Sequence, residues 1–276
     1  MRHLTLLLLS VFTVHQTKAD ILIPLDKYPT GEKRFNLQIN GSHDTSTPWL
    51  STTSFGVDED GQMGNPENWT SEQIDEDNQS VSHRLIMNSI SLRLSYRIWD
   101  NLSLWAGIGT TNFTHEETFR DDDDLSSTIF SKNMVPIYSG GLGYGHAFTD
   151  RFFMSTQPGV RYANSDNMTT IPLRDLRLNR RYLEWAVPVV AGYALGNFVP
   201  YAGILYKDYT MKDRYEFTKT YAGEDYTVRI DETFHARHKL YALAGVNYFL
   251  ADNISLGVNG SFGKRQSVQL QFNISF

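Results

Sequence analysis

The last segment of the chain decides the fold, and it reads VQLQFNISF over residues 268–276. Apolar side chains occupy every second position from Val268 to Phe276, and polar side chains occupy the positions between them. Successive side chains of a β-strand point to opposite faces, so this alternation predicts a strand with one apolar and one polar face. A half-buried strand of a soluble protein would show the same pattern. The number of such segments therefore decides between the two classes.

Nine further segments alternate in the same way. They are residues 33–40, 86–99, 102–113, 134–147, 151–162, 181–195, 198–209, 236–250 and 253–263. Most of them are long enough for the roughly 9–11 residues that a tilted membrane strand needs. The sequence therefore predicts an all-β fold: an antiparallel up-and-down transmembrane β-barrel, with ten strands expected and eight or twelve as alternatives.

The connections between these segments alternate in length. Short turns fall at residues 100–101, 149–150, 196–197 and 252–253, and longer polar loops at 41–83, 114–133, 163–180 and 210–235, with a short fifth loop near Lys264-Arg265. Bacterial barrels have short periplasmic turns and longer external loops, so an even strand count places both termini on the periplasmic side. Within the last long loop, residues 215–230 alternate again and turn at Ala222-Gly223. That segment either extends the neighbouring strands or adds two more.

The N-terminus predicts export. Met1-Arg2-His3 is a short, positively charged start, residues 4–14 are almost entirely apolar, and Thr17 and Ala19 place small residues before a cut at Asp20. This is the pattern of a secretory signal peptide, and the apolar run is too short to span a membrane as a helix. We expect a signal peptide at 1–19, a periplasmic N-terminal segment at 20–32 and the barrel with its external loops at 33–276.

Composition points to a bacterial envelope and away from nucleic acid. The chain has no cysteine, whereas a secreted eukaryotic domain of this size usually carries disulfides. Its formal net charge is -6, and removal of residues 1–19 would take away Arg2 and Lys18 and change it to -8. That balance gives no support for nucleic-acid binding.

Four charged residues fall on the polar side of predicted strands: Arg93, Arg97, Arg161 and Glu184. A charge that faced lipid near the bilayer midplane would cost a few kcal/mol, so these side chains are expected inside the barrel. With about ten strands the lumen is only slightly wider than one that side chains fill. We therefore predict one polar cluster in the lumen; passage of a small anion along the basic residues is the alternative.

Carboxylates and histidines are the residues to consider for metal binding. Acidic stretches would suit divalent cations that bridge to lipopolysaccharide, but none has the spacing of a dedicated calcium loop, and we interpret them as solvated loops. These stretches are Asp58-Glu59-Asp60, Asp75-Glu76-Asp77, Glu116-Glu117 and Asp121 to Asp124. Glu232, His235 and His238 are close in sequence, yet His235 and His238 would point to opposite faces of a strand. We predict no metal site and no cofactor.

The signal peptide, the alternating segments and the terminal Phe276 together resemble the outer-membrane β-barrel proteins of Gram-negative bacteria. Stretches such as 100–105, 141–144 and 200–203 look like the general outer-membrane β-barrel domain. In that family the last strand carries a signal for the barrel-assembly machinery, which Gln269, Ile274 and Phe276 fit, while Gln271 stands where glycine is common. The resemblance implies location in the outer membrane, contact with its lipid and lipopolysaccharide, and the assembly machinery as a partner. It names no external partner.

The function expected from these features is non-catalytic: a structural protein or a narrow passage for small solutes. The alternative is an outer-rim hydrolase of the omptin or lipase type. Omptins are ten-stranded barrels that use acidic pairs and an Asp–His pair, and Asp231 with His235, or Asp75 and Asp77 with His83, would fill such roles. Their surroundings do not match the omptin pattern, and the Gly-x-Ser-x-Gly motif of serine lipases does not occur. We predict no catalytic residues.

Overall fold

The computed structural model describes residues 35–58, 70–73, 81–121, 124–171, 177–221, 224–263 and 266–276. The predicted signal peptide (1–19) and the predicted segment 20–32 lie outside these residues. The described chain is built from antiparallel strands, and within it no helix has the length and hydropathy needed to cross a membrane.

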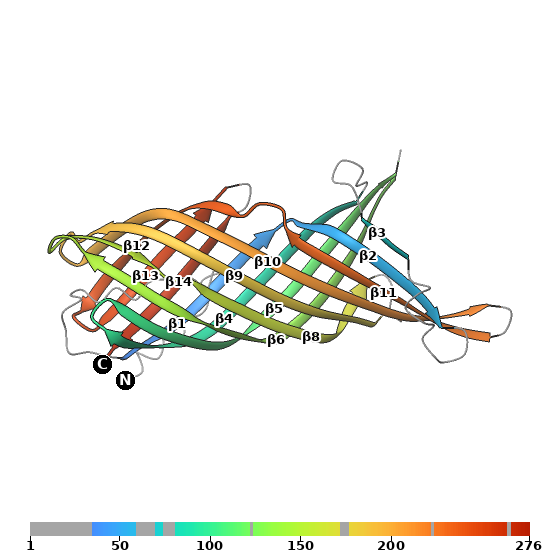
Figure 1. The fold of residues 1–276 in the computed structure, drawn as a ribbon, viewed down its shortest axis with the longest axis horizontal. Helices are drawn as coiled ribbons and strands as arrows, with labels where there is room; N and C mark the ends of the chain where they lie inside the picture. The colour runs from blue at the N-terminus through green and yellow to red at the C-terminus, as the bar shows by residue number, and fades with distance from the viewer. Residues whose placement is uncertain are drawn as a thin grey trace, which may run out of the picture.

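A closed ring of ten hydrogen-bonded strands forms the barrel (Figure 1). In ring order the strands are β1 (Phe35–Ser46), β4 (Val81–Trp99), β5 (Leu102–Asp121), β6 (Asp124–Ala147), β7 (Phe152–Thr156) continued by β8 (Gly159–Ile171), β9 (Arg177–Tyr193), β10 (Phe198–Tyr221), β12 (Leu240–Ala251), β13 (Ile254–Phe262) and β14 (Ser267–Ser275). The ring closes where β14 pairs with β1, with Leu37 opposite Ile274. The backbones of Phe35 and Phe276 exchange hydrogen bonds of 3.1 and 2.9 Å, so the last residue is tied to the first strand. The predicted ten-stranded antiparallel barrel is confirmed.

One position in the ring is shared by two short strands. The sequence predicted a single strand over 151–162, but the ladder is interrupted between Thr156 and Gly159. Pro158 lies in this gap, and a proline has no N–H to donate to a ladder. Pro188 of β9 faces the same gap, where its carbonyl accepts a 2.6 Å hydrogen bond from the Thr156 hydroxyl. The two prolines therefore account for the break.

Three further strands extend the wall beyond the ring: β2 (Pro48–Asp58), β3 (Thr70–Gln73) and β11 (Glu224–Ala236). β11 pairs with β10, β2 pairs with β11, and β3 pairs with β2. After Thr47 the chain thus pairs with β11 in place of β14, and Figure 1 shows the blue β2 beside the orange β11.

This extension corrects the long loops expected at 41–83, 114–133, 163–180 and 210–235. Within the described residues these regions are largely strand, because β4, β5, β6, β8, β9 and β10 continue far past the predicted segments. The ladder continues there while the outward-facing side chains become polar, so the apolar alternation ends before the strands do. Residues 215–230 extend β10 and β11, and the ring keeps ten strands.

The two faces of the wall differ in the way that the alternation predicts. Leu183 is 50% exposed on the outside, whereas its neighbour Glu184 is 3% exposed on the inside. Outward apolar residues form a belt in the half of the barrel that carries the short turns, for example from Ile90 to Ile98 on β4. In the other half, outward positions such as Arg84 and Arg181 are polar. The belt marks the membrane-spanning part, and we call the remainder the outer half.

Candidate functional site

The lumen beside the strands that close the ring is filled by polar side chains. Gln38 donates to Gln271, Gln269 donates to Asn40 at 3.1 Å, and Asn273 donates to Ser255 at 3.1 Å. Buried amides need partners, because an unpaired one costs on the order of 1–3 kcal/mol. Pairs between side chains of the neighbouring strands β1, β13 and β14 supply such partners, so this region is a packed polar core.

Four buried charges join β1, β8, β9 and β10 across the interior. We call Asp44, Arg161, Glu184 and Lys207 the lumen charge network. Glu184 Oε2 lies 3.0 Å from Arg161 Nη2 and 2.9 Å from Lys207 Nζ. Lys207 also pairs with Asp44, whose Oδ2 is 3.8 Å from Arg161 Nη2. Two cations and two carboxylates balance one another, which makes their burial tolerable.

The structure brings together two of the four residues predicted as a lumen cluster. Arg161 and Glu184 are directly opposite on β8 and β9 and form an ion pair. Arg93 also faces inward and is buried, with its guanidinium 3.6 Å from the centroid of the Trp105 ring. Arg97 is only half-buried and lies beside the short turn at the end of β4.

Sequence reasoning missed the other two members of the network. Asp44 fell within the predicted loop 41–83. Lys207 lies in phase with Tyr201 and Leu205, which face inward, so the inner face of β10 looked apolar. The available signal was the charge itself, because a lysine within a membrane strand is tolerated best on the inside.

An aromatic layer covers the lumen charge network on its outer side. Tyr182 of β9 packs against Phe113 of β5 and Tyr209 of β10, with ring centroids 5.8 and 5.4 Å apart. The Tyr209 hydroxyl lies 3.1 Å from the Ser46 hydroxyl on β1. This layer therefore crosses the lumen from β5 to β1.

A second group of titratable residues lies beyond this layer, in the outer half. We call it the outer histidine–acid cluster; it comprises His83, His115, Glu117, Arg180, Asp213, Tyr215 and Glu232. Glu117 Oε1 is 3.7 Å from His83 Nδ1 and 3.8 Å from His115 Nδ1. Arg180 clamps Asp213 through Nε, at 2.7 Å, and through Nη2. The same Nη2 lies 2.8 Å from His115 Nδ1, which connects β4 and β5 to β9 and β10 across the lumen.

Burial and like charge shift the acids and bases of this cluster in opposite directions. Burial, together with Glu232 and Asp213, raises the pKa of Glu117 to about 8. Burial and the neighbouring Asp213 raise the pKa of Glu232 to about 7. Burial and the Arg180 guanidinium lower the pKa of His83 to about 4. At neutral pH His83 is therefore uncharged.

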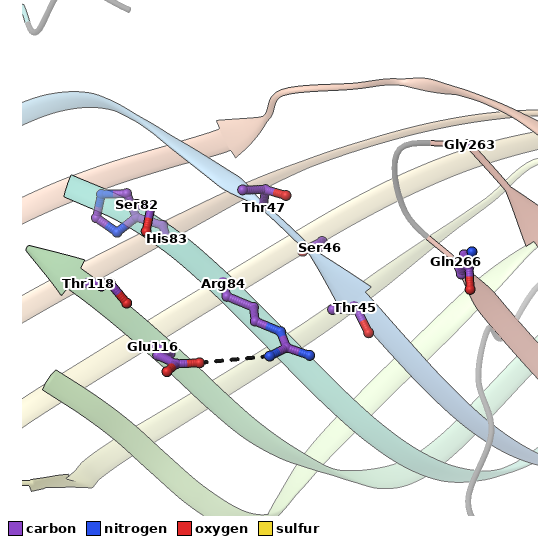
Figure 2. Close-up of a pocket in the computed structure, with 10 residues that line it drawn as sticks. All are labelled: Thr45, Ser46, Thr47, Ser82, His83, Arg84, Glu116, Thr118, Gly263 and Gln266. Atoms are coloured by element: carbon purple, nitrogen blue, oxygen red, sulfur yellow. Dashed lines mark ion pairs between the residues drawn. The ribbon is translucent and has the colours of Figure 1, made fainter. Parts of the chain in front are cut away.

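A cavity of about 510 Å³ opens beside this cluster, where the chain crosses from β1 to β2 (Figure 2). It is lined by Thr45, Ser46, Thr47, Ser82, His83, Arg84, Glu116, Thr118, Gly263 and Gln266. On its outer side Arg84 Nη1 lies 4.0 Å from Glu116 Oε2. His83 is the residue that belongs both to the cavity and to the cluster, so the cavity reaches the cluster through it.

Of the pairs considered for an omptin-like site, the described residues include Asp231 with His235, and these two side chains have different partners. Asp231 is bound by Arg214 and Arg229, at 2.7 and 3.2 Å. His235 instead lies 3.3 Å from the Thr210 hydroxyl. Asp75, Asp77 and most of the acidic stretches lie outside the described residues.

The predicted assembly signal divides between the two faces of β14. Gln269 is buried in the lumen, and Phe276 is exposed on the outside, where its ring stacks on Phe35 with centroids 6.1 Å apart. Ile274 is opposite Leu37 and Ile254 on the outward face. The alternation therefore gives these residues the orientations that the sequence implied.

No protein-family model matches this chain, and no curated protein matches it. Solved structures with a similar strand layout are outer-membrane barrels. The outer-membrane protein OprG from Pseudomonas aeruginosa is 12% identical, with a TM-score of 0.44 and coverage of 88% of this chain and 98% of that one. The outer-membrane protease OmpT from Escherichia coli is 11% identical, with a TM-score of 0.44 and coverage of 87% and 97%. The translocator domain of the autotransporter NalP from Neisseria meningitidis is 8% identical, with a TM-score of 0.43 and coverage of 90% of each chain.

Sequence identities this low carry no information about the activity of this chain. The architecture rests on the strands themselves: ten of them close into a ring, apolar residues face outward in a belt, and polar residues are buried within. By that architecture the chain has the fold of a transmembrane β-barrel.

Proposed function

We propose that this chain is a non-catalytic outer-membrane protein with a structural role, and that its barrel is closed to solutes. The lumen charge network carries the proposal. A solute moving through the barrel would have to separate Glu184 from Arg161 and Lys207, and Lys207 from Asp44. It would then meet the aromatic layer. Breaking a buried ion pair costs about 3–5 kcal/mol, which opposes spontaneous opening.

Conductance in planar lipid bilayers tests this proposal against the narrow-passage alternative. The refolded chain is expected to give no discrete conductance steps. Glu184→Ala should lower stability and still give none. Steady anion-selective steps, raised further by Glu184→Ala, would establish a passage and refute a closed barrel.

We also propose that residues 1–19 are a signal peptide and that both termini are periplasmic. All four short turns lie at the end where Phe35 meets Phe276, and the β10–β11 hairpin extends from the other end (Figure 1). Because the chain has no cysteine, single cysteines report topology. On intact cells a membrane-impermeant maleimide should label Arg237→Cys and spare Asn101→Cys. The reverse labelling would contradict this orientation.

For the last strand, we propose recognition by the barrel-assembly machinery through Gln269, Ile274 and Phe276. The exposed Phe276 ring supports this role, because it remains accessible on the outer face. Phe276→Ser should reduce the amount of heat-modifiable barrel in the outer membrane. Leu250→Ser, on the outer face of β12, is the control. Equal losses in the two variants would argue against a specific signal.

Lipopolysaccharide is the partner that we propose for the outer surface. Arg181 of β9 and Lys212 of β10 are directly opposite and exposed. Like charges in that position destabilise a sheet, so an anion between them is favoured. Leu183 and the rings of Trp185 and Tyr206, whose centroids are 4.9 Å apart, lie on the membrane side of the pair. A phosphate at the surface of the outer leaflet would fit this arrangement.

Purification of the barrel from outer membranes tests the lipid partner. Arg181→Ala together with Lys212→Ala should reduce the co-purifying lipopolysaccharide several-fold. Lys239→Ala, which removes an exposed cation already paired with Asp208 at 2.8 Å, should not. Equal retention by both variants would refute this contact.

The second candidate function is hydrolysis at the outer rim. It is favoured by one observation, the histidines and carboxylates of the outer histidine–acid cluster, which combine potential acids and bases. Peptide and lipid hydrolysis assays with the refolded chain test it. Turnover that is abolished by Glu117→Gln would establish an enzyme, and we expect no turnover.

A further inference from the structure

We propose that His83, His115 and Glu117 form a binding site for one divalent transition-metal ion in the outer half of the barrel. β4 supplies His83, and neighbouring β5 supplies His115 and Glu117. His83 and Glu117 are directly opposite in the β4–β5 ladder, and His115 is two residues from Glu117 on the same face. Two adjacent strands therefore hold all three ligands.

The distances suit a single ion. Zinc bonds to histidine nitrogen and carboxylate oxygen are about 2.0–2.2 Å long, so one ion joins atoms up to about 4.2 Å apart. Glu117 Oε1 is 3.7 and 3.8 Å from the two Nδ1 atoms, and one ligand atom from each residue lies within 4.8 Å of the others. Small rotations of the imidazole rings would bring all three into coordination distance.

Both histidines carry ring nitrogens that need a partner. His83 is 5% exposed and His115 is 0% exposed. Among the described residues neither nitrogen of His83, nor Nε2 of His115, makes a hydrogen bond. Buried polar atoms are nearly always bonded, so such a group requires an explanation. A metal bond supplies one.

The charge of the surroundings also favours a cation. The three carboxylates of Glu117, Asp213 and Glu232 converge on this part of the lumen, with Asp213 and Glu232 directly opposite on β10 and β11. Arg180 is the basic side chain of the outer histidine–acid cluster, and it is committed to Asp213. With all carboxylates ionised the cluster has an excess charge of minus two, which one divalent ion would balance.

Arg180 is also the competitor of the ion. Its Nη2 lies 2.8 Å from His115 Nδ1, so coordination through that nitrogen requires this contact to break. The bonds from Arg180 to Asp213 need not change. We therefore expect weaker binding than at a three-histidine site, and selection of Zn²⁺, Co²⁺, Ni²⁺ or Cu²⁺ over Ca²⁺ and Mg²⁺, because imidazole suits the former group. The cavity lined by His83 provides the way in (Figure 2).

Titration of the refolded full chain with Co²⁺ and with Zn²⁺ tests the site. We expect one ion per chain by calorimetry, and a visible Co²⁺ spectrum typical of nitrogen ligation. His83→Ala and Glu117→Gln should each weaken binding by at least about tenfold. Loss of a residue that only hydrogen-bonds to a metal ligand already costs about 10–100-fold in affinity, and these two residues would be ligands themselves. His146→Ala, which removes a histidine near a short turn, is the matched control.

Heat-modifiable gel mobility shows whether each variant is folded. Glu117→Gln preserves side-chain volume, so it still tests the site if His83→Ala does not fold. Absence of binding, or equal binding in the wild type, Glu117→Gln and His146→Ala, would overturn the proposal. Binding of Ca²⁺ with the same affinity as Zn²⁺ would also overturn it, because acidic loops would then be the ligands. None of these results depends on whether the barrel conducts solutes.

Discussion

Replacement of Glu184 by glutamine tests whether the lumen charge network holds the barrel together. The four charges of the network sum to zero, and Glu184→Gln leaves Arg161 and Lys207 with Asp44 as their only carboxylate in it. Removal of one partner from a buried ion pair costs about 3–5 kcal/mol. This corresponds to about two to four orders of magnitude in the folding equilibrium constant.

Reversible urea unfolding of the barrel in lipid vesicles, followed by tryptophan fluorescence and by gel mobility, measures this loss. The double variant Glu184→Gln with Lys207→Met restores a balanced network of Arg161 and Asp44, so it should recover much of the stability. Lys239→Ala breaks an exposed pair and should change stability by on the order of 0–1 kcal/mol. If Glu184→Gln lowers the free energy of unfolding no more than Lys239→Ala does, the network does not brace the barrel. The same follows if the loss in the double variant equals the sum of the losses in Glu184→Gln alone and Lys207→Met alone.

Three further predictions concern other parts of the lumen and wall. Trp105→Leu removes the ring beneath Arg93 and should lower the free energy of unfolding by about 2 kcal/mol or more. Urea unfolding measures this loss, and an unchanged midpoint would show that the cation–π contact contributes nothing. In the presence of a chelator, the outer half should become less stable as pH rises from about 6.5 to about 8. The raised pKa of Glu117 means that the folded state holds its proton longer than the unfolded state, and His83, with a pKa of about 4, no longer titrates in that window. Faster hydrogen exchange at the outer end of β5, after correction for the intrinsic pH dependence, would show this effect, and its absence would contradict it. Gly203→Ala should disrupt pairing of β10 with β9, because a Cβ would lie 2.0 Å from a backbone oxygen of β9. Gly41→Ala is the control, because a Cβ there would meet open space. Equal folding yields of the two variants would refute the packing argument.

The ring of strands was predictable because lipid imposes a regular signal on the sequence. From Ile90 to Ile98 every second residue is apolar and exposed, and no other environment requires that of an exposed face. The short turns followed from the same pattern. Beyond the belt, water accepts polar side chains on the outside, so β4 could not be traced back to Val81, nor β5 forward to Asp121.

The same limit hid the outer histidine–acid cluster. His83, His115 and Glu117 fell within the predicted loops 41–83 and 114–133, where no strand phase was assigned. Had the ladder been extended, the two-residue spacing of His115 and Glu117 would have placed them on one face. Their approach to Arg180 and Asp213 crosses the lumen between strands that are not neighbours, and no local pattern in the sequence records such a contact.

The change of partner strand after Thr47, from β14 to β11, has a consequence for how the barrel forms. The wall has two seams at different heights: β14 joins β1 near the termini, and β11 joins β2 farther out. Each seam pairs an early part of the chain with a late one, which makes both slow to close. Pairing of β1 with β14 completes a cylinder but leaves the facing edges of β2 and β11 unpaired. Unpaired strand edges can pair with other chains. A chain in which only β1 and β14 had paired would therefore form a cylinder that is still prone to pairing with its neighbours at the outer seam.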